Sequence, residues 1–288
     1  MSFCRGFLGR KKKILPDPRP WRKCYPTAHA SLIFAAIWSR QPLPMDTTML
    51  VLETDKGELG YPDISDAFFI DLAQKMRPHT RTFGIGQEAP WALYQSIEYI
   101  VRNQIQGAIV ECGVWSGGSM PLAAHALMLS SDTSRRIYLY DTFSGMPRPE
   151  AMDARWDGLP ALPTWQHYQR SGRNWCFGGS PEDVRSVLSS SRYPEDKLVF
   201  VEGMVEDTLP ATRPDQISLL RLDTDLYRST YHELVHRYPL IPSGGILILD
   251  DYGAFRDAKL ATALSIAENK LPLFLSRIDI SVRLVVKP

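Results

Sequence analysis

The chain has 288 residues, enough to bury a sizeable core, and its 44% apolar and 23% charged residues are ordinary for a globular protein. Its net charge of +1 is unevenly spread, because residues 1–45 carry +8 (nine Lys and Arg against one Asp) and the remainder carries −7. A mildly acidic main domain argues against a nucleic-acid-binding protein. Four cysteines without CxxC spacing argue against a zinc site or a disulfide framework, so reduced thiols and a cytoplasmic location are expected.

Residues 1–45 form a basic, proline-containing arm that we expect to be loosely ordered. The longest apolar run of this arm, Ala28–Trp38, is too short to span a bilayer, so no membrane association is expected. A basic segment followed by an apolar run is also found in secretory signals. Here, however, the basic region is long and no small-x-small cleavage site is clear. We therefore favour an extension of little structural consequence over a signal peptide.

Apolar periodicity beyond this arm predicts alternating helices and strands. Helices are expected over residues 64–76, 91–103, 116–129, 181–188 and 256–269, with one more between the fourth and fifth strands. Strands are expected over residues 108–110, 137–140, 198–201, 218–222 and 245–249, followed by a hairpin of 273–275 and 282–286. This order predicts one Rossmann-like α/β domain over residues 60–288, with a mostly parallel seven-stranded sheet and an antiparallel C-terminal edge.

Residues 145–179 interrupt this alternation with a segment rich in Pro, Trp and Arg that shows no clear periodicity. Connections of this length are usually functional lids or disordered segments, so a lid-like insertion is expected. Trp156, Trp165 and Trp175 either cover a bound acceptor or pack the loop itself. His167 either touches the substrate or lies on the surface.

A glycine turn follows the first strand in the segment AIVECGVWSGGSM. Its glycine spacing is neither the dinucleotide GxGxxG nor a P-loop, so nicotinamide and nucleoside-triphosphate sites are disfavoured. Glu111 at the strand tip suits a ligand with an ammonium group, and Asp141 after the next strand is placed to accept both ribose hydroxyls. An amino-acid-bearing nucleoside such as S-adenosylmethionine satisfies both acids. The alternative is a glycine turn beside two surface acids.

Two pairs of aspartates follow the fourth and fifth strands, Asp223 with Asp225 and Asp250 with Asp251. The segment between the pairs is helix-length, so the unit is a βαβ crossover whose strands are parallel. Parallel strands end at the same edge of a sheet, where open α/β folds bind ligands. If the strand geometry persists past Asp223, Asp223 and Asp225 point to the same side. The alternative is that these aspartates cap loops and the following helix.

Four segments carry a resemblance to a known family: ALYQSIEYIVRNQIQGAIVECGVWSGGSM, YLYDTFSGMP, VEGMVEDTLP and LLRLDTDLYRSTYHELVHRYPLIPSGGILILDDY. They resemble the macrocin O-methyltransferase family, whose members are class I enzymes that depend on S-adenosylmethionine and magnesium and methylate sugar hydroxyls of antibiotics. The resemblance covers roughly residues 60–288. It implies an O-methyltransferase of antibiotic or other natural-product biosynthesis, acting on a deoxysugar or another hydroxylated, glycosylated small molecule.

The resemblance also implies roles for individual residues. The cofactor S-adenosylmethionine would contact Glu111, Gly113 and Ser119 at its methionine end, Asp141, Thr142 and Phe143 at its ribose, Glu202 and Gly203 at its adenine, and Thr82 from the loop before residue 91. Mg²⁺ would be held by Asp223, Asp250 and Asp251, and Asp225 would be the general base. One position departs from the family pattern, because Ser116 stands where an arginine is expected.

Two other functions stay open on the sequence. A catechol-type metal-dependent O-methyltransferase also acts on a vicinal diol, and a catalytically silent methyltransferase-like binding protein would keep the fold without the reaction. The presence of all four aspartates disfavours the silent protein. The acceptor, the methylated position and whether the chain forms a homo-oligomer are not determined by the sequence.

Overall fold

The computed structural model describes residues 64, 66–81, 86–209 and 211–288 of the chain. The expected N-terminal arm over residues 1–45 and the candidate cofactor contact Thr82 lie outside the described residues. The described residues contain the predicted sheet and the helices that flank it.

The sheet has seven strands in the order β3-β2-β1-β4-β5-β7-β6, and it confirms the predicted mostly parallel sheet with an antiparallel edge. Strands β1 to β5 pair in parallel, whereas β7 is antiparallel to both β5 and β6. Reversal of chain order between β1 and β4 creates a crevice at the carboxyl ends of these strands, where such folds bind ligands. The strands are β1 Ala108–Cys112, β2 Ile137–Asp141, β3 Leu198–Glu202, β4 Ile217–Leu222, β5 Ile246–Leu249, β6 Ser276–Arg277 and β7 Arg283–Val286.

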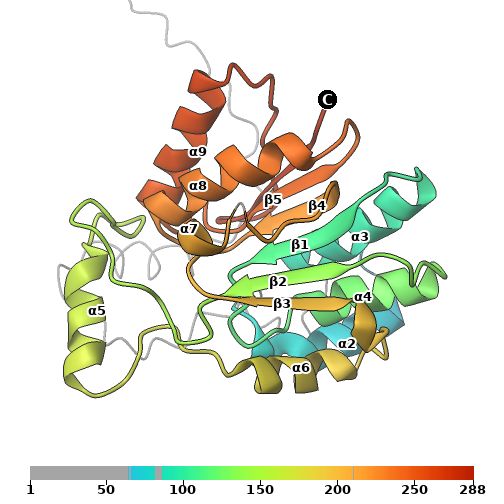
Figure 1. Cartoon of the computed structure of the whole chain (residues 1–288), viewed down its shortest axis with the longest axis horizontal. Helices are drawn as coiled ribbons and strands as arrows, with labels where there is room; N and C mark the ends of the chain where they lie inside the picture. The colour runs from blue at the N-terminus through green and yellow to red at the C-terminus, as the bar shows by residue number, and fades with distance from the viewer. Residues whose placement is uncertain (1–63, 65, 82–85, 210) are drawn as a thin grey trace, which may run out of the picture. The chain divides into compact units, whose positions relative to one another are not determined.

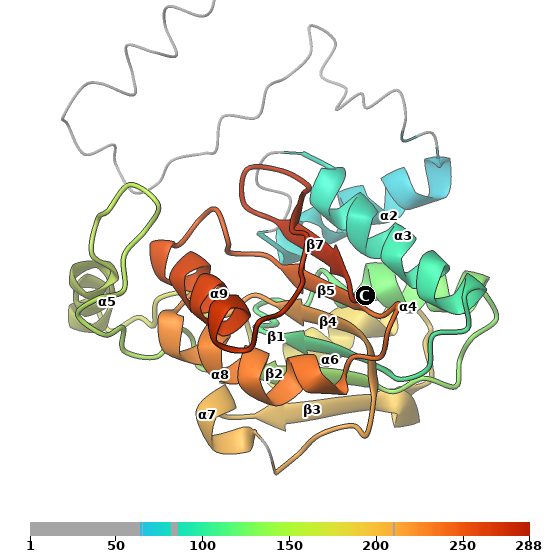
Figure 2. The same ribbon diagram turned by 90° about the horizontal axis from the view of Figure 1, so that it is seen from above.

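Two helical layers cover the faces of the sheet (Figures 1 and 2). One layer consists of α2 Ala67–Met76, α3 Glu88–Arg102, α4 Met120–Leu129 and α6 Pro181–Ser189, and the other of α7 Val205–Thr208, α8 Tyr227–Arg237 and α9 Arg256–Glu268. Helix α5 Ala161–Arg170 stands apart from both layers at one end of the sheet. Short 3-10 turns lie at η2 Arg77–His79, η3 Glu195–Lys197 and η4 Tyr238–Leu240.

Alternation along the buried strands divides the core between the two faces. Ile109 in β1 joins the core cluster under α3 and α4, and its neighbour Val110 joins the cluster that includes Leu234 of α8. Both residues have no exposed surface, as expected for parallel strands covered on both sides. The paired layers hold the strand ends in a fixed arrangement, and the site is built on those ends.

The structure differs from the expected elements in two places that bear on the site. Residues 145–179 contain helix α5, although the sequence predicts no regular structure there. Of the residues in α5, Ala161 is the buried one, so the helix does not need an apolar stripe facing the core. The sequence therefore lacks the apolar periodicity by which such helices are predicted. Helix α4 begins at Met120 rather than near Ser116 because Gly117 adopts a left-handed conformation, with φ of +80°, in the turn before it.

Candidate active site

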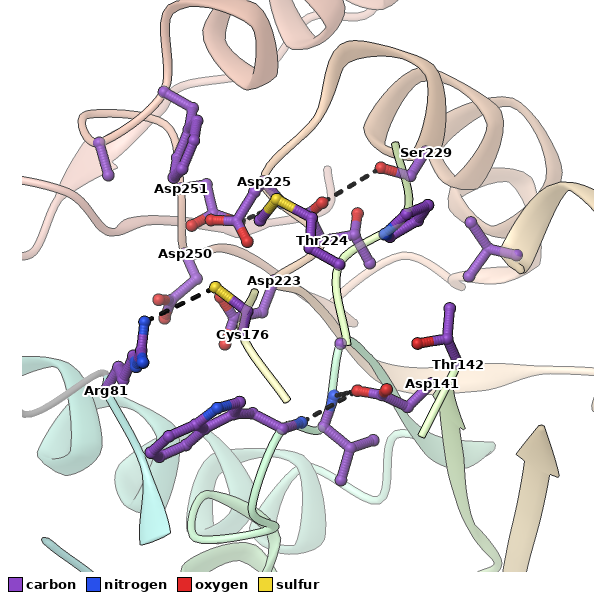
Figure 3. Close-up of a pocket in the computed structure, with 18 of the residues that line it drawn as sticks. Arg81, Asp141, Thr142, Cys176, Asp223, Thr224, Asp225, Ser229, Asp250 and Asp251 are labelled. Atoms are coloured by element: carbon purple, nitrogen blue, oxygen red, sulfur yellow. Dashed lines mark hydrogen bonds between the residues drawn. The ribbon is translucent and has the colours of Figure 1, made fainter. Parts of the chain in front are cut away.

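A cavity of about 670 Å³ opens at the carboxyl ends of the parallel strands (Figure 3). It brings together residues that are far apart in the sequence and that the sequence analysis assigns to the cofactor, the metal and the base. The predicted residues on its wall are Gly113, Ser119, Asp141, Thr142, Gly203, Asp223, Asp225, Asp250 and Asp251.

Three other predicted cofactor residues do not line this cavity. Glu111 and Phe143 are buried behind its wall, with 0% and 7% of their surfaces exposed, and Glu202 is exposed at the end of β3. Of the three tryptophans in the insertion, Trp156 and Trp175 line the cavity, whereas Trp165 donates its indole N–H to the carbonyl oxygen of Met146. His167 is exposed and lies off the cavity wall.

The glycine turn after β1 allows the close approach of two strand ends. Gly113 has φ of +84°, and a Cβ on it would lie 1.9 Å from the carbonyl oxygen of Asp223. Its amide donates to the carbonyl oxygen of Tyr140 at 2.8 Å. Any side chain at this position would push the turn after β1 away from the turn after β4. Gly113 therefore sets the spacing between the predicted cofactor and metal ends of the site.

Asp141 holds the glycine turn in place. Its Oδ2 accepts hydrogen bonds from the amides of Val114 and Trp115 at 2.7 and 3.0 Å, and its Oδ1 accepts one from the amide of Phe143 at 2.8 Å. A carboxylate has about four acceptor sites and three are used here, so Asp141 can orient the turn and still accept one hydroxyl through Oδ1.

Asp223, Asp250 and Asp251 form the candidate metal centre. One carboxylate oxygen from each of the three residues lies within 4.8 Å of the other two. Among the described residues, these three form the cluster of side chains that could hold a metal ion. Burial raises the pKa of Asp223 and of Asp251 well above the usual range, and repulsion from Asp250 raises both further. A set of carboxylate oxygens in this position suits a hard divalent cation, which would relieve that repulsion.

Arg221 lies beneath this centre and was missed by the sequence analysis. Its side chain is 2% exposed, and it forms ion pairs with Glu111 at 2.7 Å, Asp223 at 2.8 Å and Asp250 at 2.7 Å. Burial raises the pKa of Glu111 to about 7, although Arg221 opposes that rise. The sequence held a signal for this residue, because an arginine occurs inside the otherwise apolar strand ISLLRL. An arginine in a buried strand needs acidic partners, so its presence there indicates a buried ion pair.

Asp225 reaches the site by a route different from the expected one. Strand β4 ends at Leu222, and Asp225 adopts a left-handed conformation with φ of +65°, so strand alternation with Asp223 does not apply. Its amide donates to Oδ2 of Asp251 at 2.9 Å, which places the residue beside the candidate metal centre. Burial, with repulsion from Asp223, raises the pKa of Asp225 to about 7.

Fold and site together define the class of protein. A seven-stranded sheet in this order, with a glycine turn after β1 and an acid at the end of β2, is the Rossmann-like class I methyltransferase fold. Residues 73–284 match the sequence model of the family described as Macrocin-O-methyltransferase (TylF). The chain belongs to this family, as its motifs imply.

Curated relatives and solved structures agree with the family. The chain is 32% identical to demethyldecarbamoylnovobiocin O-methyltransferase of Streptomyces niveus over 158 residues, which cover 55% of this chain and 57% of that protein. It is also 32% identical, over 58% of its length, to 8-demethyl-8-(2,3-dimethoxy-alpha-L-rhamnosyl)-tetracenomycin-C 4'-O-methyltransferase of Streptomyces olivaceus, and spans 61% of that relative. The structure of the O-methyltransferase NovP superposes with a TM-score of 0.62 at 28% identity, covering 73% of this chain and 82% of that one.

Among the described residues, no helix is both long enough and apolar enough to cross a membrane.

Proposed function

We propose that this chain is an S-adenosylmethionine- and divalent-metal-dependent O-methyltransferase that methylates a sugar hydroxyl, or another vicinal hydroxyl, of a small-molecule natural product. The observation that carries the proposal is the convergence of Asp223, Asp250 and Asp251 in the same cavity as the Gly113 turn and Asp141. The acceptor class is supported by the names of the relatives, one of which specifies a rhamnosyl-bearing tetracenomycin.

The cofactor would lie across the ends of β1, β2 and β3. Gly113 and Ser119 would bind its methionine end, Asp141 and Thr142 its ribose, and Gly203 its adenine, since all five residues line the cavity. Glu111, Phe143 and Glu202 would support this surface from behind or beside it. Glu111 would act through Arg221, because its carboxylate contacts the Arg221 guanidinium and not the cavity.

The acceptor hydroxyl would be activated at the ends of β4 and β5. Mg²⁺ held by Asp223, Asp250 and Asp251 would supply a Lewis acid that lowers the pKa of a bound hydroxyl. Asp225 lies beside these ligands and would accept the hydroxyl proton as the C–O bond forms and the cofactor's C–S bond breaks. The hydrogen bond from its backbone amide to the Asp251 carboxylate would hold the base in a fixed position relative to the metal ligands, as general-base catalysis requires.

The insertion would cover the reacting groups. Trp156 and Trp175, both within residues 145–179, line the cavity. The amide of Trp156 donates to the carbonyl oxygen of Ala254 at 2.8 Å, just beyond the aspartates that follow β5. Apolar rings at this position would exclude water and orient the acceptor.

Ligand-dependent thermal melting and a methylation assay test the proposal. S-adenosylhomocysteine should raise the melting temperature, and a panel of glycosides and catechols incubated with S-adenosylmethionine and Mg²⁺ should contain an acceptor that gains a methyl group by mass spectrometry. Asp225→Asn should lower turnover by about 100-fold or more while leaving S-adenosylhomocysteine affinity within a few-fold. Asp196→Asn, in an exposed acid away from the cavity, is the matched control. Absence of any shift with the cofactor product would refute the enzyme assignment.

A further inference from the structure

The cavity wall has a strongly one-sided charge. Its acidic residues are Asp141, Glu206, Asp223, Asp225, Asp250, Asp251 and Asp279, and Arg81 is the basic residue among the described residues that line it. A cation at the candidate metal centre would neutralise part of the acid at the ends of β4 and β5. Arg81 is then the one positive charge that the described part of the wall itself supplies.

Arg81 lies between the glycine turn and the aspartates, because it contacts Trp115 of the turn and also interacts electrostatically with Asp225. The hydroxyls of Thr80 and Ser119 are 3.2 Å apart, which joins the residue before Arg81 to the residue that precedes helix α4. The Arg81 guanidinium lies over the Trp115 ring, 4.8 Å from its centroid, and Nη1 donates to Sγ of Cys176 at 3.6 Å (Figure 3). Arg81 forms no salt bridge with any acid in the described part of the chain.

The glycine turn itself offers no cation. Ser116 occupies the position where the family resemblance leads us to expect an arginine, and its hydroxyl donates to the carbonyl oxygen of Gly178 at 2.5 Å. Ser116 is not on the cavity wall. A guanidinium resting on the neighbouring Trp115 lies above the same turn, although it comes from a different part of the chain.

S-adenosylmethionine has two cationic groups, the sulfonium and the ammonium, and one anionic group, the carboxylate. The acids of the cavity suit the two cations but repel the carboxylate. Arginine is the residue best matched to a carboxylate, because its planar guanidinium can donate two parallel hydrogen bonds.

We propose that Arg81 binds the carboxylate of the methionine moiety of S-adenosylmethionine. This inference rests on the proposed function and adds a residue that the family resemblance does not supply. A carboxylate could also come from the acceptor, so the test has to separate the two sources.

The test compares two ligands by isothermal titration calorimetry: S-adenosylhomocysteine and its analogue that lacks the carboxylate. Wild-type protein should bind S-adenosylhomocysteine about 10- to 100-fold more tightly, as expected for a charge-assisted hydrogen-bonded pair. Arg81→Met should bind both ligands with nearly the same affinity, and Arg81→Lys should keep part of the preference. Arg77→Met, in an exposed arginine of the preceding turn that does not line the cavity, should behave like wild type.

Two outcomes would overturn the inference. If Arg81→Met keeps the full preference for the carboxylate, the methionine carboxylate is bound elsewhere, even if the KM for an anionic acceptor rises. If Arg81→Met weakens both ligands equally, Arg81 shapes the cavity without contacting the carboxylate. Failure of the wild-type protein to bind either adenosyl compound would instead refute the proposed function, which keeps the two failures distinguishable.

Discussion

Arg221→Met is the substitution with the largest effect expected from the structure. Methionine preserves much of the length of the side chain but removes the charge that faces Glu111, Asp223 and Asp250. The Arg221 and Glu111 side chains are 2% and 1% exposed, so solvent does not screen the loss of that pair. Carboxylates that shared one guanidinium would then repel each other in the interior.

Removing one partner of a buried ion pair typically costs about 3–5 kcal/mol of folding free energy. For domains of about 150–250 residues, each kcal/mol shifts the melting temperature by about 2–4 °C, so a fall of roughly 6–20 °C is expected. Asp223 is 25% exposed and can be hydrated, which favours the lower part of this range. Burial also raises the pKa of Glu111, so protonation can relieve part of the cost at acidic pH.

Differential scanning calorimetry in EDTA and then in excess Mg²⁺ measures this effect. Mg²⁺ should raise the melting temperature of Arg221→Met more than that of wild type, because a cation at Asp223 and Asp250 would replace the missing charge. Lys75→Met, which breaks an exposed pair with Asp71, should change stability by less than about 1 kcal/mol. This role of Arg221 is refuted if Arg221→Met melts within the range of that control in EDTA, or if Mg²⁺ stabilises Arg221→Met and wild type equally.

Substitutions at three further positions test other parts of the site. Gly113→Ala should lower the free energy of unfolding by at least ~2 kcal/mol in urea titrations, because its Cβ would collide with the Asp223 carbonyl. The Glu111 pKa of about 7 lies above its ordinary 4.5, so the stability it contributes is full below pH 4.5 and is lost as pH rises through 7. Glu111→Gln should therefore flatten the decline of unfolding free energy over this interval. Asp153 Oδ1 accepts a hydrogen bond from the Tyr227 amide at 3.1 Å, which ties residues 145–179 to the start of α8. Asp153→Ala removes this acceptor and should speed proteolysis of residues 145–179, whereas Asp153→Asn keeps an acceptor oxygen and should be cleaved more slowly than Asp153→Ala.

The architecture was predictable because it depends on patterns that are local in sequence. The alternation of apolar strands with amphipathic helices such as α3, whose Leu93, Ile97 and Ile100 are all buried, indicated the parallel sheet. The same logic placed the glycine turn and the aspartate pairs at one edge, since parallel strands must end together. The start of α6 is also encoded locally, because the Ser180 hydroxyl accepts a hydrogen bond from the Asp183 amide three residues later.

The parts that were not predicted depend on contacts between distant segments. Arg221 is stabilised by acids from β1 and from the ends of β4 and β5, and no local pattern contains all of these partners. Asp225 is oriented by a left-handed turn, which a hydrogen bond from its backbone amide to Asp251 stabilises. Strand periodicity cannot predict such a turn. Asp153 reaches the first turn of α8, whose N-cap Leu226 supplies no side-chain acceptor.

The distribution of charge separates the cavity into two functional ends. At the ends of β4 and β5, Arg221 lies below the aspartates and compensates only part of their charge, which leaves repulsion that a divalent cation would relieve. At the glycine turn, Arg81 lies on the cavity wall; its charge also acts on Asp225, but no salt bridge joins it to an acid among the described residues. One buried arginine thus supports an acidic cluster suited to a metal, and one accessible arginine faces the space proposed for a zwitterionic cofactor. The spacing between these two ends depends on Gly113, because only a glycine lets the turn after β1 touch the turn after β4.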